Sequence, residues 1–298
     1  MRMLIGVDGS DSSLNAVRMA AGICDPAADL LAFYYSPREL EKRVPDGSRS
    51  IVGGAAAAVF ADARDLLPAD VASRAEFIQT DAAAAPGILD SAVTWQADVV
   101  VVGARGHGSF QQLLLGSVSR AVVHGARLPV LVVRSGPPKD RGLRVLACHH
   151  PASAAAVAKA IGHIHWPAST EGAVIGVAES LLAGPLPSWL ESRVRDPDTA
   201  AVAQAWQQEH DAEVTALEGT LAAFAATLPT PFRTARPIVS QGNAGEKILE
   251  RAAADGIDLV VIGRTPTDAL TRWLLGSTSE AVLTRAAANV LIVPVENR

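Results

Sequence analysis

The sequence predicts an α/β fold made of two tandem domains, each a doubly wound parallel β-sheet with helices on both faces. Three observations lead to this prediction. Short apolar runs rich in β-branched residues alternate with longer segments of helical spacing. Strands that alternate with helices form βαβ units, whose right-handed crossovers place helices on both faces of a parallel sheet. The pattern occurs twice in 298 residues, a length typical of about two domains.

Composition excludes several classes of protein. No apolar run reaches the roughly 18 residues of a membrane span, and the first residues lead into a strand without a secretory signal. A net charge of −5 and an aromatic content of 4% argue against a nucleic-acid groove. The only cysteines, Cys24 and Cys148, suggest a reduced compartment. We therefore expect a cytoplasmic protein that binds neither nucleic acid nor membrane.

The first elements begin with a buried strand at residues 3–7. The turn at residues 8–12 is rich in capping side chains, so Asp11 or Ser12 is expected to cap the helix that follows. A second strand covers residues 30–35, and residues 36–50 are charged and irregular.

The remaining elements of the first domain repeat the same alternation. We expect helices at residues 51–67, 82–95 and 117–125, and strands at residues 72–79, 99–102 and 130–133. Pro86 is compatible with the first turn of its helix. Residues 135–140, with Gly and two Pro, have the composition of a linker.

Glycines follow the β-branched run at residues 99–102. The spacing is Gly103-x2-Gly106-x9-Gly116-Ser117. Glycines after a buried strand let the backbone approach a ligand, and successive N–H groups there can form an anion-binding concavity. The helix that begins at Ser117 adds N-terminal N–H groups and a favourable dipole.

We interpret this segment as a triphosphate cradle made of loop backbone, the helix start and the hydroxyls of Ser117 and Ser119. A glycine-rich turn that binds nothing is the alternative. The segment is neither a Walker A loop, because the lysine is missing, nor a dinucleotide G-x-G-x-x-G motif. Arg105 is the fixed cation of the loop. Its side chain either contacts phosphate or is exposed to solvent. Asp8 ends the first strand at the same edge of the sheet, where ligands of such folds bind.

The chain resembles the universal stress protein family. The resemblance is carried by the G-x2-G-x9-G-S spacing after a buried strand, by MLIGVDGS at residues 3–10 and by LPVLVVR at residues 128–134. It implies a flavodoxin-like (Rossmann-like) fold for both domains and a bound adenine nucleotide. It further implies that the last strands of the two domains, at residues 130–133 and 290–293, pair across a pseudo-twofold axis, with a homodimer as a further possibility.

The resemblance carries over ATP as the ligand, with Mg²⁺ expected beside its phosphates. In the family the aspartate after the first strand, the backbone at the end of the second strand and the loop glycines surround the nucleotide. Tyr34 stands where the family has a small aliphatic residue. The positions expected to bind are Val7, Asp8, Gly9, Ser10, Tyr34, Val102, Gly103, Arg105, Gly106, Gly116, Ser117, Val118 and Ser119.

An internal repeat defines the two expected domains, residues 1–135 and 141–298. A shift of 140 places residues 5–17 on residues 145–157, and a shift of 160 places residues 97–103 on residues 257–263. On this alignment Cys148 replaces Asp8, and Pro266, which lacks an N–H, replaces Gly106. We expect a nucleotide site in the first domain and a degenerate site in the second.

The second domain carries an insertion at residues 181–228. Residues 199–228 have the apolar spacing of one long helix, with the stripe Val214, Leu217, Leu221, Phe224 and Leu228. The stripe is expected to cover the sheet. An N-terminal overhang that contacts a partner, with Trp189 and Trp206, is the alternative.

The histidines suggest a metal site, but His149, His150, His163 and His165 lack a completing cluster, so we expect no metal ligands in the protein. No catalytic constellation is evident either. The sequence therefore predicts an ATP-binding stress-response regulator with slow hydrolysis at most. The alternatives are a nucleotide-independent interaction protein and, with less support, an adenylating ATP pyrophosphatase.

Overall fold

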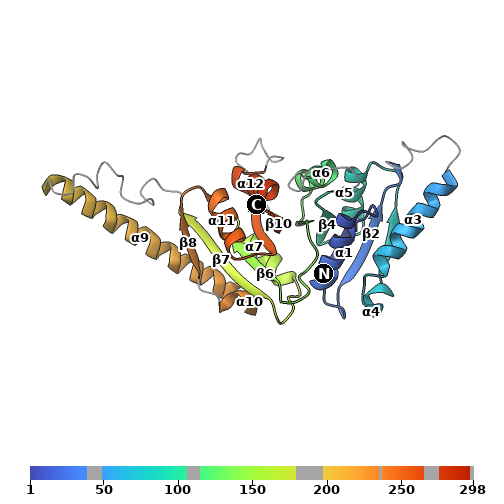
Figure 1. The fold of residues 1–298 in the computed structure, drawn as a ribbon, viewed down its shortest axis with the longest axis horizontal. Coiled ribbons are helices and arrows are strands. Elements are labelled where there is room, and N and C mark those ends of the chain that lie inside the picture. The colour runs from blue at the N-terminus through green and yellow to red at the C-terminus, as the bar shows by residue number, and fades with distance from the viewer. Residues whose placement is uncertain (39–48, 106–114, 179–196, 235–236, 265–274, 296–298) are drawn as a thin grey trace.

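The computed structural model describes residues 1–38, 49–105, 115–178, 197–234, 237–264 and 275–295. In these residues the chain forms one ten-stranded sheet in the order β3-β2-β1-β4-β5-β10-β9-β6-β7-β8. Figure 1 shows the sheet running along the long axis, with α5, α6, α11 and α12 on one face and α1, α3, α7 and α9 on the other. The expected α/β class with doubly wound halves is confirmed.

The first half of the chain supplies five strands and five helices among the described residues. The strands are β1 (Arg2–Gly6), β2 (Leu30–Tyr35), β3 (Glu76–Gln79), β4 (Val99–Gly103) and β5 (Val130–Val133). The helices are α1 (Asp11–Gly22), α3 (Arg49–Arg64), α4 (Ala69–Ala72), α5 (Ala84–Thr94) and α6 (Ser117–Gly125).

The second half repeats this arrangement. Its strands are β6 (Arg144–Cys148), β7 (Glu171–Ala178), β8 (Ile238–Gln241), β9 (Leu259–Arg264) and β10 (Asn289–Pro294). Its helices in the described residues are α7 (Ala154–His163), α9 (Pro197–Thr227), α10 (Thr230–Arg233), α11 (Ala244–Ala254) and α12 (Ser277–Arg285).

The direction of the strands changes once, at the centre of the sheet. All pairs within each half are parallel, whereas β5 and β10 pair antiparallel, with Leu131 opposite Leu291. The strands of the two halves therefore run in opposite directions. Their carboxyl ends, where ligands of parallel sheets bind, lie on opposite edges of the common sheet.

Two apolar layers hold the helices against the sheet. One packs α1, α7 and α9 on side chains such as Ile5 and Val101, and the other packs α5, α6, α11 and α12 on side chains such as Leu4 and Val100. Successive residues of a strand alternate between the layers because strand side chains have a period of two. This explains why the central strands are apolar at every position.

Two local expectations were wrong. The segment expected as a strand at residues 72–79 contains the end of the short helix α4 and only four strand residues. The cap of α1 is Ser10, whose hydroxyl accepts a hydrogen bond from the Ser13 N–H at 3.2 Å, and not Asp11 or Ser12.

The long helix of the insertion is α9, and its C-terminal part packs as expected. Leu221, Phe224 and Leu228 are buried against β7, β8 and α10, while Leu217 is partly buried. The other end of α9 extends away from the sheet (Figure 1). Residues 181–196, including Trp189, lie outside the described residues, so the alternative overhang contact is not tested.

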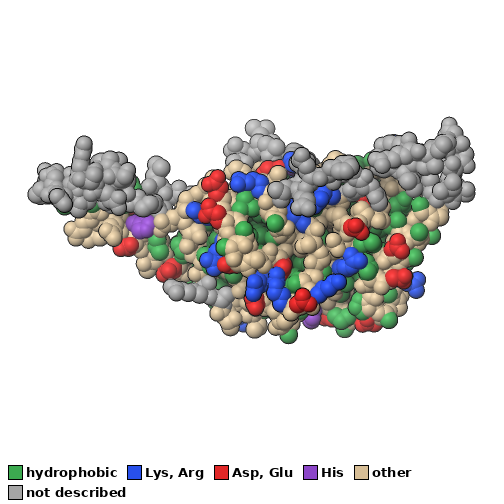
Figure 2. All heavy atoms as spheres, in the orientation of Figure 1, with side chains coloured by type: hydrophobic (Ala, Val, Ile, Leu, Met, Phe, Trp, Pro, Cys, Tyr) green, Lys and Arg blue, Asp and Glu red, His purple; other side chains and the backbone are tan. Residues whose placement is uncertain are grey.

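The surface mixes charges of both signs. On the face in Figure 2, Lys and Arg side chains alternate with Asp and Glu over the body of the protein. Within the described ranges, no helix is both long enough and apolar enough to span a bilayer.

Candidate functional site

The loop between β1 and α1 holds Asp8 at the carboxyl edge of the first half. Asp8 Oδ1 accepts hydrogen bonds from the Ser10 N–H at 3.0 Å and from the Ser10 hydroxyl at 2.6 Å. Gly9 has φ of 81°, a left-handed conformation that glycine adopts without strain. The Asp8 side chain is exposed, so this loop presents an oriented carboxylate to solvent.

The end of β4 packs directly against the start of α1. A Cβ atom on Gly103 would lie 2.6 Å from Ser12 Oγ and 2.7 Å from the Ser12 carbonyl carbon, so only glycine fits. The Arg105 N–H donates to Ser12 Oγ at 3.2 Å. The two loops that the sequence placed at one edge, after β1 and after β4, are thus in contact through Ser12.

The start of α6 completes this edge. Gly116 is the N-cap residue, with φ −65° and ψ 154°, and no side chain caps the helix. The Ser119 hydroxyl donates to the Gly103 carbonyl at 2.6 Å, which ties α6 to β4. Ser117 is exposed and Val118 is half-buried. The helix start therefore presents Ser117 and its first N–H groups outward, while the Ser119 hydroxyl holds the scaffold together.

Three of the expected binding residues are buried in the core. Val7 and Val102 are 4% and 3% exposed, and Tyr34 is 1% exposed. The Tyr34 hydroxyl bonds the Thr80 hydroxyl at 2.7 Å, and the Tyr34 carbonyl accepts from the Val7 N–H at 2.9 Å. Tyr34 therefore shapes the floor of the crevice and does not project into it.

Space for the Tyr34 ring comes from Gly87 in α5. A Cβ atom there would lie 1.8 Å from the Tyr34 hydroxyl oxygen. Gly87 and Thr80 belong to the structure of this edge and were not singled out from the sequence. Because Tyr34 and Thr80 are 46 residues apart, no local sequence pattern indicates this contact.

Basic side chains gather at the same edge. Burial, and to a lesser extent the nearby Arg105 guanidinium, lower the pKa of Arg134, which follows β5. The Arg134 guanidinium itself donates to the carbonyls of Leu283 and Ala286 in the second half, both at 2.6 Å. Gly106 lies outside the described residues, so its expected contact is not tested.

The second half has a different register from the one expected. Arg2 N–H donates to Asp98 Oδ2 at 2.7 Å, and Arg144 N–H donates to Asp258 Oδ2 at 2.8 Å. The first strands of the two halves are thus offset by 142 residues and not by 140. In the structure Cys148 corresponds to Gly6, and the proposed replacement of Asp8 by Cys148 is wrong.

The residue in the place of Asp8 is His150. His149 takes the place of Val7, since the His149 N–H donates to the Ile175 carbonyl at 2.8 Å as Val7 does to Tyr34. His150 is exposed, and its Nδ1 accepts from the Ala152 N–H at 3.3 Å, the same i to i+2 bond that Asp8 makes. An imidazole thus replaces the carboxylate.

The scaffold of the second crevice is otherwise retained. Gly276 caps α12 with φ −59° and ψ 152°, and the Ser279 hydroxyl donates to the Gly263 carbonyl at 2.8 Å. Pro266 lies outside the described residues. Among the residues with described positions, no three His, Cys, Asp or Glu side chains are grouped to hold a metal ion.

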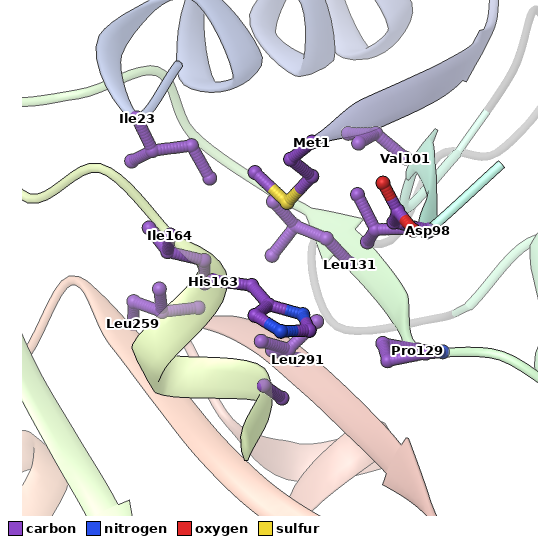
Figure 3. Close-up of a pocket in the computed structure, with 12 residues that line it drawn as sticks. Met1, Ile23, Asp98, Val101, Pro129, Leu131, His163, Ile164, Leu259 and Leu291 are labelled. Carbon is purple, nitrogen blue, oxygen red and sulfur yellow. The ribbon is translucent and has the colours of Figure 1, made fainter. Parts of the chain in front are cut away.

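A cavity of about 30 Å³ lies between the two halves, away from the carboxyl edge of the first half. Met1, Leu131, His163 and Leu291 point into it in Figure 3. Such a volume admits water but is far too small for a nucleotide. This cavity is therefore not the candidate site.

Comparison with known proteins agrees with the fold. A family model described as "Universal stress protein family" matches residues 1–134 and 149–294. A universal stress protein of Mycobacterium tuberculosis strain CDC 1551 is 32% identical over 139 residues, which cover 45% of this chain and 95% of that protein. Other curated matches are local, since the chain spans about a third of universal stress protein A homolog 2 of Coxiella burnetii, with 54% identity over 48 residues.

Solved structures extend the likeness to the full length. A universal stress protein from Archaeoglobus fulgidus DSM 4304 has a TM-score of 0.62 at 18% identity, covering 99% of this chain and 98% of that chain. A universal stress protein solved in complex with cAMP is 28% identical, covers 46% of this chain and 98% of that chain, and has a TM-score of 0.32. With the family model matched in both halves, the chain belongs to the universal stress protein family.

Proposed function

We propose that the first half of the chain binds ATP and that the protein acts as a nucleotide-dependent regulator of the stress response in the cytoplasm. One observation carries the proposal. The exposed Asp8 carboxylate, the contact of Gly103 and Arg105 with Ser12, and the uncapped start of α6 all lie at one edge of the sheet.

The phosphate groups belong at the start of α6. Its N-cap is a glycine without a capping side chain, so the first N–H groups of the helix suit an anion. A Cβ atom on Gly116 would lie 3.3 Å from the Ala104 carbonyl oxygen, a close contact that a shift of a few tenths of an ångström would relieve. Ser117 and Arg105 add a hydroxyl and a positive charge on either side.

Asp8 belongs with the sugar or base. A carboxylate beside phosphates would be repelled, whereas hydroxyl and amino groups donate to it. Magnesium would be held mainly by the phosphate oxygens, because the described residues offer no cluster of three acidic or histidine ligands. The protein would then bind Mg-ATP without a set of its own side chains that coordinates the metal ion.

The side chains at the carboxyl edge of the first half suit binding of ATP better than its rapid hydrolysis. Phosphoryl transfer requires a residue that orients the attacking water and charge that stabilises the transferred group. Of the side chains assigned to the site above, the Asp8 carboxylate is engaged with Ser10, and the others are serines and Arg105. We therefore expect hydrolysis to be slow.

A nucleotide-independent interaction protein is the second candidate. The contact of Gly103 with Ser12 and the bond from Ser119 to Gly103 explain these motif positions by packing alone. On that account the glycine segment would be structural, and ATP would leave the protein unchanged.

Thermal unfolding with and without Mg-ATP separates the two. At an ATP concentration of a hundred times the Kd, binding to the folded state adds roughly 2.7 kcal/mol of stability. Gly116→Asp, which puts a negative charge at the phosphate position, should fold and show no shift. Equal melting of the wild type with and without ATP would reject the proposal, as would a shift that Gly116→Asp retains.

A further inference from the structure

The helix α6 is held at its C-terminus by an arginine from the other half of the chain. Arg264, the last residue of β9, donates through Nη1 to the carbonyls of Val123, His124 and Ala126 at 3.1, 3.3 and 3.4 Å. The last carbonyls of a helix have no partner within the helix, so this guanidinium caps it.

The second half receives the same support in return. Arg134 donates to the carbonyls of Leu283 and Ala286, both at 2.6 Å. These carbonyls stand 160 residues after those of Val123 and Ala126, so they are the same positions of the repeat. Each half thus caps the C-terminus of a helix in the other half, although Arg134 follows β5 and Arg264 is the last residue of β9.

The two helices are also linked nearer their starts. Arg120 Nη1 lies 2.9 Å from Glu280 Oε1, and His124 Nε2 lies 3.6 Å from Glu280 Oε2. Arg120 and Glu280 occupy equivalent positions of the repeat, so α6 and α12 contact each other about the pseudo-twofold axis. In Figure 1 they lie next to each other on the same face of the sheet.

This geometry places the two ends of α6 at opposite edges of the sheet. Its N-terminus lies at the carboxyl edge of the first half, and its C-terminus lies beside Arg264 at the carboxyl edge of the second half. Nine residues of α-helix span about 13.5 Å. A helix this short is rigid, so what fixes its C-terminus also fixes the direction of its first N–H groups.

We propose that Arg264 is a positioning residue for the nucleotide site of the first half. It orients α6, and its positive charge offsets the partial negative charge at the C-terminus of the helix. The second half would then serve the first site by holding the helix that binds phosphate. The effect on affinity rests on the proposed function, but the effect on α6 itself does not.

The test uses the full chain with Arg264→Gln and Arg264→Lys. Hydrogen exchange without nucleotide should show α6 amides exchanging about tenfold faster in Arg264→Gln, as expected for loss of a helix cap. Arg264→Lys keeps the positive charge and one donor group, so its α6 amides should exchange at a rate between those of the wild type and Arg264→Gln. The same comparison is made with Arg264→Lys alone if Arg264→Gln does not fold.

Affinities for Mg-ATP and for adenosine give the second readout. In Arg264→Gln the affinity for ATP should fall about three- to tenfold, whereas that for adenosine should stay the same, because only phosphate uses the helix start. The control is Arg141→Gln, which breaks the ion pair between Arg141 Nη1 and Asp258 Oδ2 at 2.6 Å and should change neither readout for α6.

The outcomes separate this inference from the proposed function. Unchanged exchange of α6 in Arg264→Gln overturns the inference, and so does an equal loss of ATP and adenosine affinity. A wild type that binds neither ligand rejects the proposed function, while faster exchange of α6 in the variant would still support Arg264 as the clamp on this helix.

Discussion

In the first half, the N-cap residue of α6 is Gly116, and in the second half the N-cap residue of α12 is Gly276, with nearly the same backbone angles. A serine in the first turn of each helix bonds the carbonyl of a glycine at the end of a strand. Those strand glycines, Gly103 and Gly263, each pack against a serine at the start of the first helix of their own half, Ser12 in α1 and Ser153 at the N-cap of α7. The frame of the crevice is therefore the same in both halves.

The side chains of the loops differ. Asp8 in the first half corresponds to His150 in the second, and the buried Val7 corresponds to His149. His149 is half-buried and contacts Phe224 of α9 with ring centroids 5.0 Å apart. The comparison teaches that glycines and serines of such a motif can be kept for packing alone. If the first half binds ATP as proposed, the loop carboxylate of Asp8 is the residue expected to distinguish its site from the second half.

The largest effect is expected from the shared frame. Gly103→Ala places a Cβ within 2.7 Å of the Ser12 backbone, and Gly263→Ala places one 2.2 Å from Ser153 Cβ. Each should lower the free energy of unfolding by about 3 kcal/mol in urea titrations. Gly219→Ala in α9, where nothing lies within 4 Å, is the control and should be neutral or stabilising. If Gly263→Ala left the free energy of unfolding unchanged, the packing around Gly103 and Gly263 would not be equivalent in the two halves.

A second prediction tests the difference between the loops. Asp8→His, which copies His150, should lower ATP affinity by about a hundredfold, or roughly 2.7 kcal/mol, because the carboxylate that accepts from the nucleotide is lost. His150→Asp should not create a second site, since Pro266 remains in the loop. Isothermal titration gives both the affinity and the stoichiometry. Two ATP bound per wild-type chain would contradict the asymmetry.

The smallest effect concerns His149. Burial, and then the neighbouring His150, lower the pKa of His149 below 6.5. As pH falls through 6.5, the unfolded chain takes up the proton before the folded protein does, so folding stability decreases. His149→Val, which copies Val7, removes this loss. Its melting temperature should exceed that of the wild type by more at about pH 5 than at about pH 8. An equal difference at both pH values would show that protonation of His149 does not matter.

Much of the fold could be predicted because it depends on short-range patterns. The run at residues 99–102 is apolar at every position, as a strand covered on both faces requires, and it is β4. The stripe of Leu221, Phe224 and Leu228 correctly predicted a helix that covers the sheet. The edge strand β3 was predicted too long, because half of its apolar residues belong to a turn and to α4.

The site was harder to predict because its details depend on contacts between distant segments. The alignment without gaps matched Asp8 with Cys148 at an offset of 140, whereas the first strands are offset by 142 residues and the serines Ser12 and Ser153 by 141. The register of the strands follows from their pairing with β4 and β9 and from the hydrogen bonds of Asp98 and Asp258. The capping roles of Arg134 and Arg264 join residues about 140 to 150 positions apart, and no local pattern indicates them.

The antiparallel junction of β5 and β10 has one more consequence. If the two half-sheets belonged to separate subunits, they would come apart on dilution, and every substitution would appear on both sides at once. Here a single polypeptide connects them, so their association does not depend on protein concentration. Each side is also free to diverge, which is how two histidines can occupy one loop while a carboxylate persists in the other.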